Sequence, residues 1–264
     1  QAEIDAANAY EALFVPALFG QWAPKVADAA GIQSDARVLD VACGTGILAR
    51  EIASRIGARG HVAGVDSSAG MIAVAARMAP RVEWREGAAE SLPFPDASFD
   101  VVVSQFGLTF FADRHRALRE MARVLTAGGR LAVAVFDGLD SMPAYATEVA
   151  LLDRMAGRQA ADALRAPFLL GDRDELARLF SQAGFAAVEI ATHAGTARFP
   201  AIRAMVEADL RGWLPVMGVV LTEEQIADLL AEADQALSAY ATPGGQAEFP
   251  VSVHLVTAVN GHQP

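Results

Sequence analysis

The stretch from residue 36 to residue 46 constrains the fold more than any other part of the chain. A short apolar run, interrupted by Asp40, ends in a turn that contains Gly44 and Gly46, and residues 47–53 continue with helical spacing. Short apolar runs that end at turn residues are typical of buried parallel strands. Glycine permits unusual backbone angles and allows a ligand to approach the main chain closely. We therefore predict a buried strand, a tight turn and a helix N-terminus that together hold a ligand.

The alternation of strand and helix continues as far as residue 136. Further strands are predicted at residues 60–66, 82–86, 99–104 and 130–136, of which 82–86 is the shortest. Helices are predicted between them, at residues 45–57, 67–78 and 114–126. The pair Gly128 and Gly129 is expected to end the last of these helices, because glycine is favoured just beyond a helix C-terminus. Apolar strands that alternate with helices indicate a parallel sheet covered on both faces.

The pattern changes after Asp137. Helices are predicted over 139–167, 172–183 and 199–240, with a sixth strand at 185–192 and a seventh at 248–259. The expected fold class is α/β, with a Rossmann-like, seven-stranded, mostly parallel sheet and helices on both faces. We expect a single domain, residues 1–264, with helical cap insertions at 139–170 and 196–247. Since strands five and six would run parallel to strand one, both insertions should begin at the carboxyl edge and cover the ligand.

The first 30 residues form a separate feature of the pattern. They are expected to fold as two helices, broken at Pro16 and Gly20, with aromatic side chains at Tyr10, Phe14, Phe19 and Trp22. These rings can simply pack the helices onto the main domain. They can also form part of a helical flap, residues 1–30, that closes over a ligand.

Composition narrows the classes of protein that remain. The chain has 264 residues, 53% of them hydrophobic, and one cysteine, which fits a reducing cytoplasm. A net charge of −11 argues against binding nucleic acid through a general basic surface. No apolar run approaches the roughly 20 residues of a membrane helix, and residues 1–5 do not begin a signal peptide. We expect a cytoplasmic protein with no nucleic-acid partner and no membrane span; a homodimer is compatible with the sequence.

The glycine turn alone is compatible with more than one ligand. Gly44, Gly46 and Ala49, with Asp66 twenty residues after Gly46, loosely satisfy the dinucleotide fingerprint, so an NAD-linked oxidoreductase is one hypothesis. Asp40 argues against it, because a carboxylate beside the turn would repel a pyrophosphate. A ligand with an ammonium or sulfonium group suits that carboxylate better. The alternative for Asp40 is a purely structural hydrogen bond to amides of the turn.

Five stretches, in this order and spacing, resemble class I S-adenosylmethionine-dependent methyltransferases of the small-molecule branch. They are residues 38–46, 64–71, 86–94, 98–104 and 119–125. The resemblance is dense over residues 36–137 and thin over 170–192. The segment 104–108 is also similar to the quinone and polyketide methyltransferases. The resemblance implies S-adenosyl-L-methionine as cofactor and a small-molecule substrate.

The resemblance also implies a role for each matching residue. Asp40, Ala42, Gly44 and Gly46 would line the methionine part of the cofactor. Asp66 would hold the ribose hydroxyls, with Ser67 and Met71 beside the ribose and adenine. Ala88 and Ala89 would lie on the adenine, although the family commonly has an acid at the position of Ala88. Ser104, Gln105 and Phe106 would lie near the methyl group. The resemblance implies no metal.

No catalytic residue is assigned. The candidates for a base are Tyr10, His115, Tyr145, His193 and His254, each of which has a more ordinary structural explanation. Cys43 lies inside the turn with no histidine nearby in the sequence, which favours space filling over a nucleophile.

The expected function is methyl transfer to a small, apolar or aromatic metabolite, which suits a cap rich in methionine, such as Met142, Met205 and Met217. Besides the oxidoreductase, a non-catalytic S-adenosylmethionine-binding protein remains an alternative.

Overall fold

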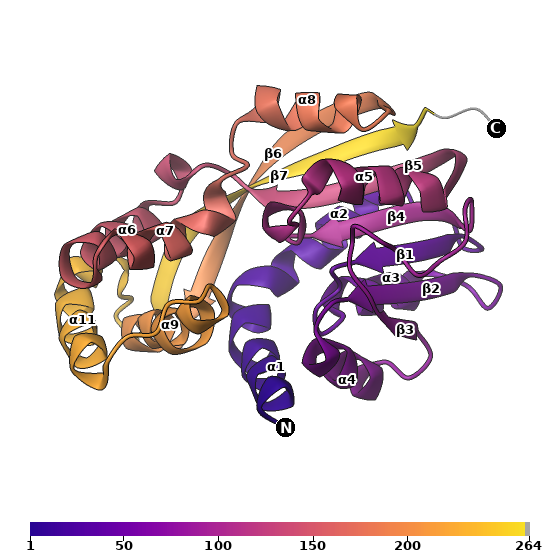
Figure 1. Cartoon of the computed structure of the whole chain (residues 1–264). Coiled ribbons are helices and arrows are strands. Elements are labelled where there is room, and N and C mark those ends of the chain that lie inside the picture. Colours follow the sequence, from indigo (N-terminus) through magenta and orange to yellow (C-terminus); the bar gives the residue numbers. More distant parts are fainter. Residues whose placement is uncertain (262–264) are drawn as a thin grey trace.

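The computed structural model describes residues 1–261. Its seven-stranded sheet has the order β3-β2-β1-β4-β5-β7-β6, and of the seven strands only β7 runs antiparallel to the rest (Figure 1). The strands are β1 (Arg37–Val41), β2 (His61–Asp66), β3 (Glu83–Glu86), β4 (Phe99–Gln105), β5 (Leu125–Phe136), β6 (Phe185–Phe199) and β7 (Ala247–Asn260). The predicted α/β fold with a mostly parallel sheet is confirmed.

Helices cover both faces of this sheet because side chains alternate across each strand. Val38 of β1 faces the core beneath α2 (Ala23–Ala30) and α3 (Ile47–Arg55), whereas Leu39 faces the opposite core. That second core lies beneath α5 (Arg114–Val124) and α8 (Arg173–Gln182). The helix α4 (Ala69–Met78) packs beside β2 and β3, so the carboxyl ends of β1, β2 and β4 are left for a ligand.

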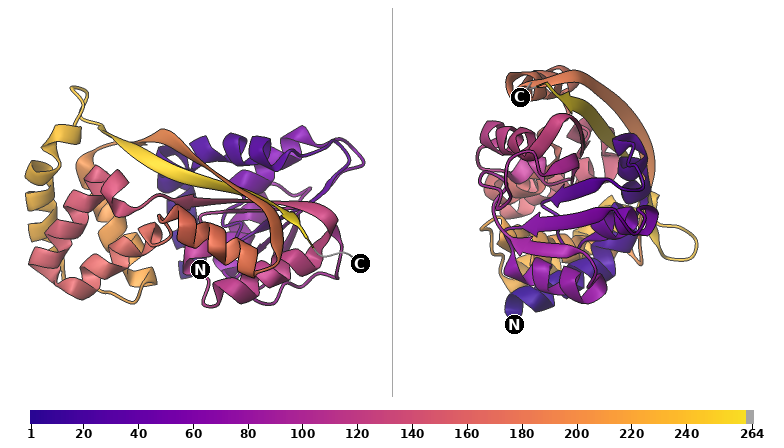
Figure 2. Two further views of the ribbon diagram at one scale, coloured as in Figure 1. Left: turned by 90° about the horizontal axis from the view of Figure 1, so that it is seen from above. Right: turned by 90° about the vertical axis from the view of Figure 1, so that its right-hand side faces the viewer.

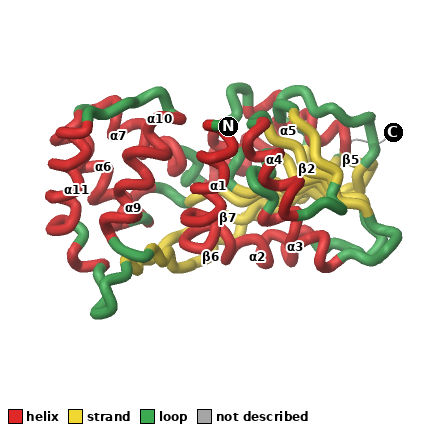
Figure 3. Tube along the Cα trace, turned by 90° about the horizontal axis from the view of Figure 1, so that it is seen from below, coloured by secondary structure: helices red, strands yellow, loops and turns green. Residues whose placement is uncertain are grey.

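The N-terminal segment forms one continuous helical run instead of two separated helices. The helix α1 (Ala2–Phe14) passes through a π-helical turn, η1 (Val15–Phe19), and a 3-10 turn, η2 (Gly20–Trp22), into α2. Pro16 lies in the first turn of η1, where a missing N–H is tolerated. The run lies between α4 and the cap when the molecule is seen from below (Figure 3).

The start of β5 also differs from the prediction. The helix α5 ends at Val124, and Leu125 is already extended, with φ −75° and ψ 141°. Gly128 and Gly129 therefore lie inside β5 and do not end the helix. The pairing of β4 with β5 shifts register between Phe99 and Val101, which accommodates these residues as an irregular start of the strand.

The strands β6 and β7 carry the cap on a long ribbon. β6 continues to Phe199, beyond the predicted end at residue 192, so the second helical segment spans 200–246 and not 196–247. Pairing of β5 with β7 ends at Phe136 and Val253, whereas β6 and β7 stay paired up to Phe199 and Ala247. Figure 2 shows the ribbon extending from the sheet to the cap.

The cap consists of helices from both insertions. They are α6 (Pro143–Ala156), α7 (Arg158–Arg165), α9 (Ile202–Ala208), the π-helical turn η6 (Asp209–Trp213), α10 (Leu214–Val216) and α11 (Glu223–Ala236), with the short 3-10 turns η4 (Leu139–Ser141), η5 (Ala166–Phe168) and η7 (Ser238–Tyr240). Their apolar side chains join the core beneath α2 and α3, so the cap and the sheet share one hydrophobic cluster. Among residues 1–261, no helix is long and apolar enough to cross a membrane.

Candidate functional site

The turn after β1 has a backbone that few residue types tolerate. Gly44 and Gly46 have φ of 54° and 86°, and Ala42 also has a positive φ, 56°. Side-chain space is limited as well, because a Cβ atom on Gly46 would lie 2.4 Å from the Trp84 ring. A Cβ atom on Gly64 of β2 would lie at the same distance from the same ring. Trp84 therefore fixes the outer side of the turn and leaves its amides facing the carboxyl edge of the sheet.

Asp40 lies below this turn and is only 1% exposed. Its Oδ2 accepts a hydrogen bond from the amide of Ala49 in α3 at 3.0 Å, whereas its Oδ1 has no partner within residues 1–261. Burial, and secondarily the charge of Asp66, raise the pKa of Asp40 well above its ordinary value. The structural interpretation of Asp40 thus accounts for one oxygen only. The second is a buried acceptor suited to a cationic group.

Asp66 ends β2 and faces the same space. Its Oδ2 accepts from the amide of Gly44 and its Oδ1 from the amide of Ser68, both at 2.9 Å. Each oxygen keeps a further lone pair, so the carboxylate is held in place yet can still accept from ligand hydroxyls. Burial raises the pKa of Asp66 against these stabilising hydrogen bonds.

A cavity of about 200 Å³ opens beside Asp66. Of the predicted cofactor-binding residues, five line it: Ala42, Asp66, Ser67, Ala88 and Ala89. Glu90, which the resemblance suggested as a neighbour of the adenine, also lines it, as do Gly87, Phe110, Phe111 and Ala112, which were assigned no cofactor role from the sequence. Phe110 and Phe111 could have been predicted from the sequence, because two adjacent aromatic residues follow β4 in a connecting segment at the carboxyl edge of the sheet. Phe110 is 43% exposed and contacts Trp213 of the cap edge-on, with ring centroids 5.0 Å apart.

The remaining predicted residues are not among those that line this cavity. Met71 lies in the first turn of α4, where its amide donates to the Ser68 hydroxyl at 3.3 Å. Ser104 Oγ and Gln105 Oε1, at the end of β4, are buried and have no hydrogen-bond partner in the described chain. Phe106 follows with a positive φ of 63° and stacks on Phe136 at 4.2 Å. The end of β4 therefore presents two unused polar atoms and an aromatic wall.

The helix α1 lies across the glycine turn. Its Glu11 carboxylate accepts from the hydroxyl of Thr45 and forms an ion pair with Arg50 at 2.7 Å. The ring of Tyr10 would be 4.0 Å from a Cβ atom on Gly44. Burial, together with the carboxylates of Asp66, Glu11 and Asp40, raises the pKa of the Tyr10 hydroxyl far above its ordinary value. Tyr10 is therefore a poor base, but it stands at the mouth of the site.

The three histidines considered from the sequence do not supply a base to this region. His115 is exposed on α5 and His193 is half-buried within β6. His254 is buried, with its ring nitrogens bonded to Thr192 Oγ1 and to the carbonyl of Gly171, both at 2.9 Å. Cys43 is buried inside the turn, and burial raises the pKa of its thiol. In residues 1–261 no group of three or more His, Cys, Asp and Glu side chains is placed to hold a metal ion.

The fold is a Rossmann-like methyltransferase fold. It has an aspartate near the end of β1, a glycine turn, an aspartate at the end of β2, and an antiparallel β7 between β5 and β6. The YcgJ protein of Bacillus subtilis aligns with 92% of this chain and 99% of its own, at a TM-score of 0.61 and 21% identity. Phosphoethanolamine N-methyltransferase 2 of Haemonchus contortus, solved with phosphomonomethylethanolamine and S-adenosylhomocysteine, aligns at a TM-score of 0.59 and 19% identity. It covers 96% of this chain and 56% of that one.

Sequence comparison matches part of the chain to methyltransferases. Residues 39–133 match the family described as "Methyltransferase domain". The ubiquinone/menaquinone biosynthesis C-methyltransferase UbiE of Hahella chejuensis is 40% identical over 121 residues, which are 44% of this chain and 49% of that protein. The chain thus spans about half the length of this curated relative.

Residues 39–133 therefore have the sequence of a methyltransferase domain. The predicted resemblance to S-adenosylmethionine-dependent methyltransferases is supported by this domain match and by the similarity to UbiE. Neither the domain match nor these relatives support an NAD-linked oxidoreductase. The residues present fit the cofactor, because buried Asp40 keeps one oxygen free for an ammonium group and Asp66 borders a cavity.

Proposed function

We propose that the protein transfers a methyl group from S-adenosylmethionine to a small, apolar or aromatic molecule. The observation that carries the proposal is the buried and half-unpartnered carboxylate of Asp40 beneath the glycine turn. A negative charge there would repel the pyrophosphate of a dinucleotide and attract the ammonium group of an amino acid. The curated relative named for ubiquinone and menaquinone biosynthesis supports a quinone-type ring as the acceptor.

Each predicted residue has a role in this proposal. Asp40 and the amides of the turn would bind the methionine end of the cofactor, with Ser104 and Gln105 beside it. Asp66 would accept from the ribose hydroxyls. Apart from Ala42, which would lie at the methionine part, the remaining cavity residues, with Met71, would enclose the adenine. The bound cofactor supplies an electrophilic methyl group whose bonding electron pair stays with sulfur when the methyl group leaves.

The chain's own contribution would be alignment and exclusion of water. Phe106 and Phe136 form a stacked pair next to the methyl end, and Phe19 of the N-terminal run contacts both rings, at 5.3 and 6.2 Å. An aromatic acceptor packs well against such walls. The segment 1–30 would act as a flap over the bound cofactor, and the two insertions would form the cap over the substrate.

The test combines binding with turnover. Calorimetry of the full chain should give micromolar binding of S-adenosylhomocysteine and none of NADH; the reverse result contradicts the proposal. Methyl-labelled S-adenosylmethionine is then incubated with the protein and a panel of reduced quinones and phenols. Label should move into an organic-extractable product. Tight cofactor binding without product from any panel member or from a metabolite extract would favour the non-catalytic binding protein.

A further inference from the structure

Two carboxyl groups are buried in the cap without partners. Glu148 of α6 is 0% exposed and Asp209, the first residue of η6, is 3% exposed. Both oxygens of Glu148, and Oδ2 of Asp209, accept no hydrogen bond within residues 1–261. Burial and the neighbouring Asp209 raise the pKa of Glu148 far above its ordinary value, and burial raises that of Asp209 to about 8. Unpaired polar groups in an apolar interior are unfavourable and therefore call for a partner.

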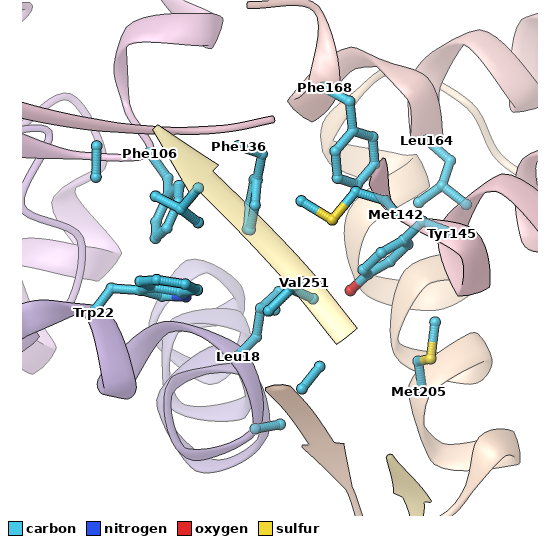
Figure 4. Close-up of a cluster of buried hydrophobic side chains, with 14 of the residues drawn as sticks. Leu18, Trp22, Phe106, Phe136, Met142, Tyr145, Leu164, Phe168, Met205 and Val251 are labelled. Atoms are coloured by element: carbon cyan, nitrogen blue, oxygen red, sulfur yellow. The ribbon is translucent and has the colours of Figure 1, made fainter. Parts of the chain in front are cut away.

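A third polar group faces the same place. Tyr145 precedes Glu148 by one turn of α6, so the two side chains share a face of the helix. It is 4% exposed, and its hydroxyl forms no hydrogen bond with any residue of the described chain. Burial, then the charges of Asp209 and Glu148, raise the pKa of this hydroxyl. Figure 4 shows the hydroxyl pointing away from α6, toward Val251 of β7.

Aromatic rings connect this cluster to the cofactor side. The ring of Tyr145 lies 5.2 Å from that of Phe168, which lies 5.5 Å from Phe136, and Phe136 stacks on Phe106. Phe106 directly follows Gln105, whose side-chain oxygen is unpartnered at the end of β4. Met142 and Met205 lie beside this series of rings (Figure 4). Methionine side chains are flexible and adapt to different shapes, so a ring-shaped ligand can replace their present packing.

We propose that Tyr145, Glu148 and Asp209 form the distal end of the substrate site and bind a hydroxyl group carried by an aromatic ring. The inference rests on the proposed methyltransferase function. A hydroxyl can donate to the carbonyl oxygen of a protonated carboxyl of the pair and accept from Tyr145 at the same time. A neutral group also suits a site whose burial opposes net charge. These residues determine which substrate binds and how it is oriented, and no proton transfer is assigned to them.

The test uses 2-naphthol as the probe and 2-methoxynaphthalene as its matched analogue, which lacks the donor. Both are titrated into the full chain by calorimetry, with and without saturating S-adenosylhomocysteine. The wild-type protein should prefer 2-naphthol by about fivefold, the equivalent of one hydrogen bond between neutral groups of about 1 kcal/mol. Equal affinities, absence of binding of both probes, or tighter binding of a naphthylmethyl ammonium ion overturns the proposal.

Variants connect the preference to the named groups. Glu148→Leu removes the acceptor at similar volume, and Tyr145→Phe removes only the hydroxyl; each should reduce the preference for 2-naphthol to less than about threefold, because the donor loses its partner. Asp153→Leu, on the exposed side of the same helix, should leave it unchanged. An unchanged preference in both test variants, with an unaltered melting temperature, refutes the role. Binding of S-adenosylhomocysteine is measured separately. If S-adenosylhomocysteine does not bind, the proposed function is contradicted, and the titrations without it still test the role of Glu148 and Asp209.

Discussion

At the scale of single residues, the two acids at the ends of β1 and β2 have different tasks. Asp40 is buried, and one of its oxygens accepts no hydrogen bond in the described chain. Both oxygens of Asp66, beside the cavity, accept hydrogen bonds from backbone amides. In the proposed complex, Asp40 faces the amino-acid end of the cofactor and Asp66 faces the ribose. Two ligands that differ in that amino-acid end can therefore separate the two roles.

Asp40→Asn should weaken S-adenosylhomocysteine binding by roughly 10- to 150-fold, since about 1.5–3 kcal/mol is typical of a hydrogen bond to a charged group. Adenosine, which lacks the ammonium group, should bind as before. The variant keeps an oxygen for the amide of Ala49, so the turn should retain its shape. Calorimetry with both ligands measures the effect, and equal losses for both would contradict the assignment.

Asp66→Ala should weaken both ligands alike, again by about 1.5–3 kcal/mol, because the ribose hydroxyls lose a charged acceptor. It should also abolish any preference for adenosine over 2′-deoxyadenosine. Asp96→Ala removes a carboxylate that is 78% exposed and paired with Arg123, and it serves as the control. Unchanged affinity of the Asp66 variant, with the control also unchanged, would rule out the ribose role.

At the scale of elements, the N-terminal run connects parts that are distant in the sequence. Glu11 of α1 binds Thr45 and Arg50 at the glycine turn. Further along the same run, the Gln21 side chain exchanges two hydrogen bonds with the backbone of Thr196 in β6, at 2.9 and 3.0 Å. Movement of α1 would uncover the turn while the Gln21 contact still anchors the run.

Glu11→Gln should speed dissociation of S-adenosylhomocysteine by about 2- to 10-fold, since a partly buried ion pair and a charge-assisted hydrogen bond hold α1 over the turn. Stopped-flow displacement measures the rate. Glu3→Gln, at an exposed position of the same helix, provides the comparison. Identical rates in the two variants would show that α1 does not retain the ligand.

The elements that sequence alone predicted well are those whose signal is local. Residues 38–41 and 99–104 are apolar because both faces of their strands are covered, and the glycines of the turn are required by positive φ. The extension of β6 over 193–199 was missed because that segment pairs only with β7 and lacks an apolar run. The carboxyl pair was missed for a different reason. Glu148 and Asp209 are 61 positions apart, and acidic residues in helices are ordinarily exposed.

At the scale of the whole molecule, the buried acids make stability depend on pH. A carboxyl group whose pKa is raised on folding binds more protons in the folded state than in the unfolded state. The free energy of unfolding therefore falls as pH rises from the unfolded pKa, about 4, toward the folded value, which is about 8 for Asp209. Acid within this window should stabilise the chain, opposite to the usual effect of paired carboxylates.

Asp209→Asn should remove the proton that Asp209 binds on folding. Its stability relative to wild type should grow with pH, by at most about 1.4 kcal/mol per pH unit. Urea denaturation of both proteins at pH 5.5, 6.5 and 7.5 measures the difference, and Asp228→Asn, at an exposed position in α11, controls for surface charge. Parallel pH profiles of wild type and Asp209→Asn would contradict a raised pKa.

The ribbon of β6 and β7 has a consequence for how such a protein can change its substrate. Beyond Phe136 these two strands pair with each other, apart from a bridge between Ala241 and Ala247 at the start of β7, and the cap is inserted between them and after β5. Replacement of residues 138–170 and 200–246 would therefore leave every hydrogen bond of the seven-stranded sheet and the acid-lined turn in place. Backbone pairing therefore does not tie the cap to the sheet, and a transplanted cap would need only to match the apolar side chains that the present cap packs into the core beneath α2 and α3.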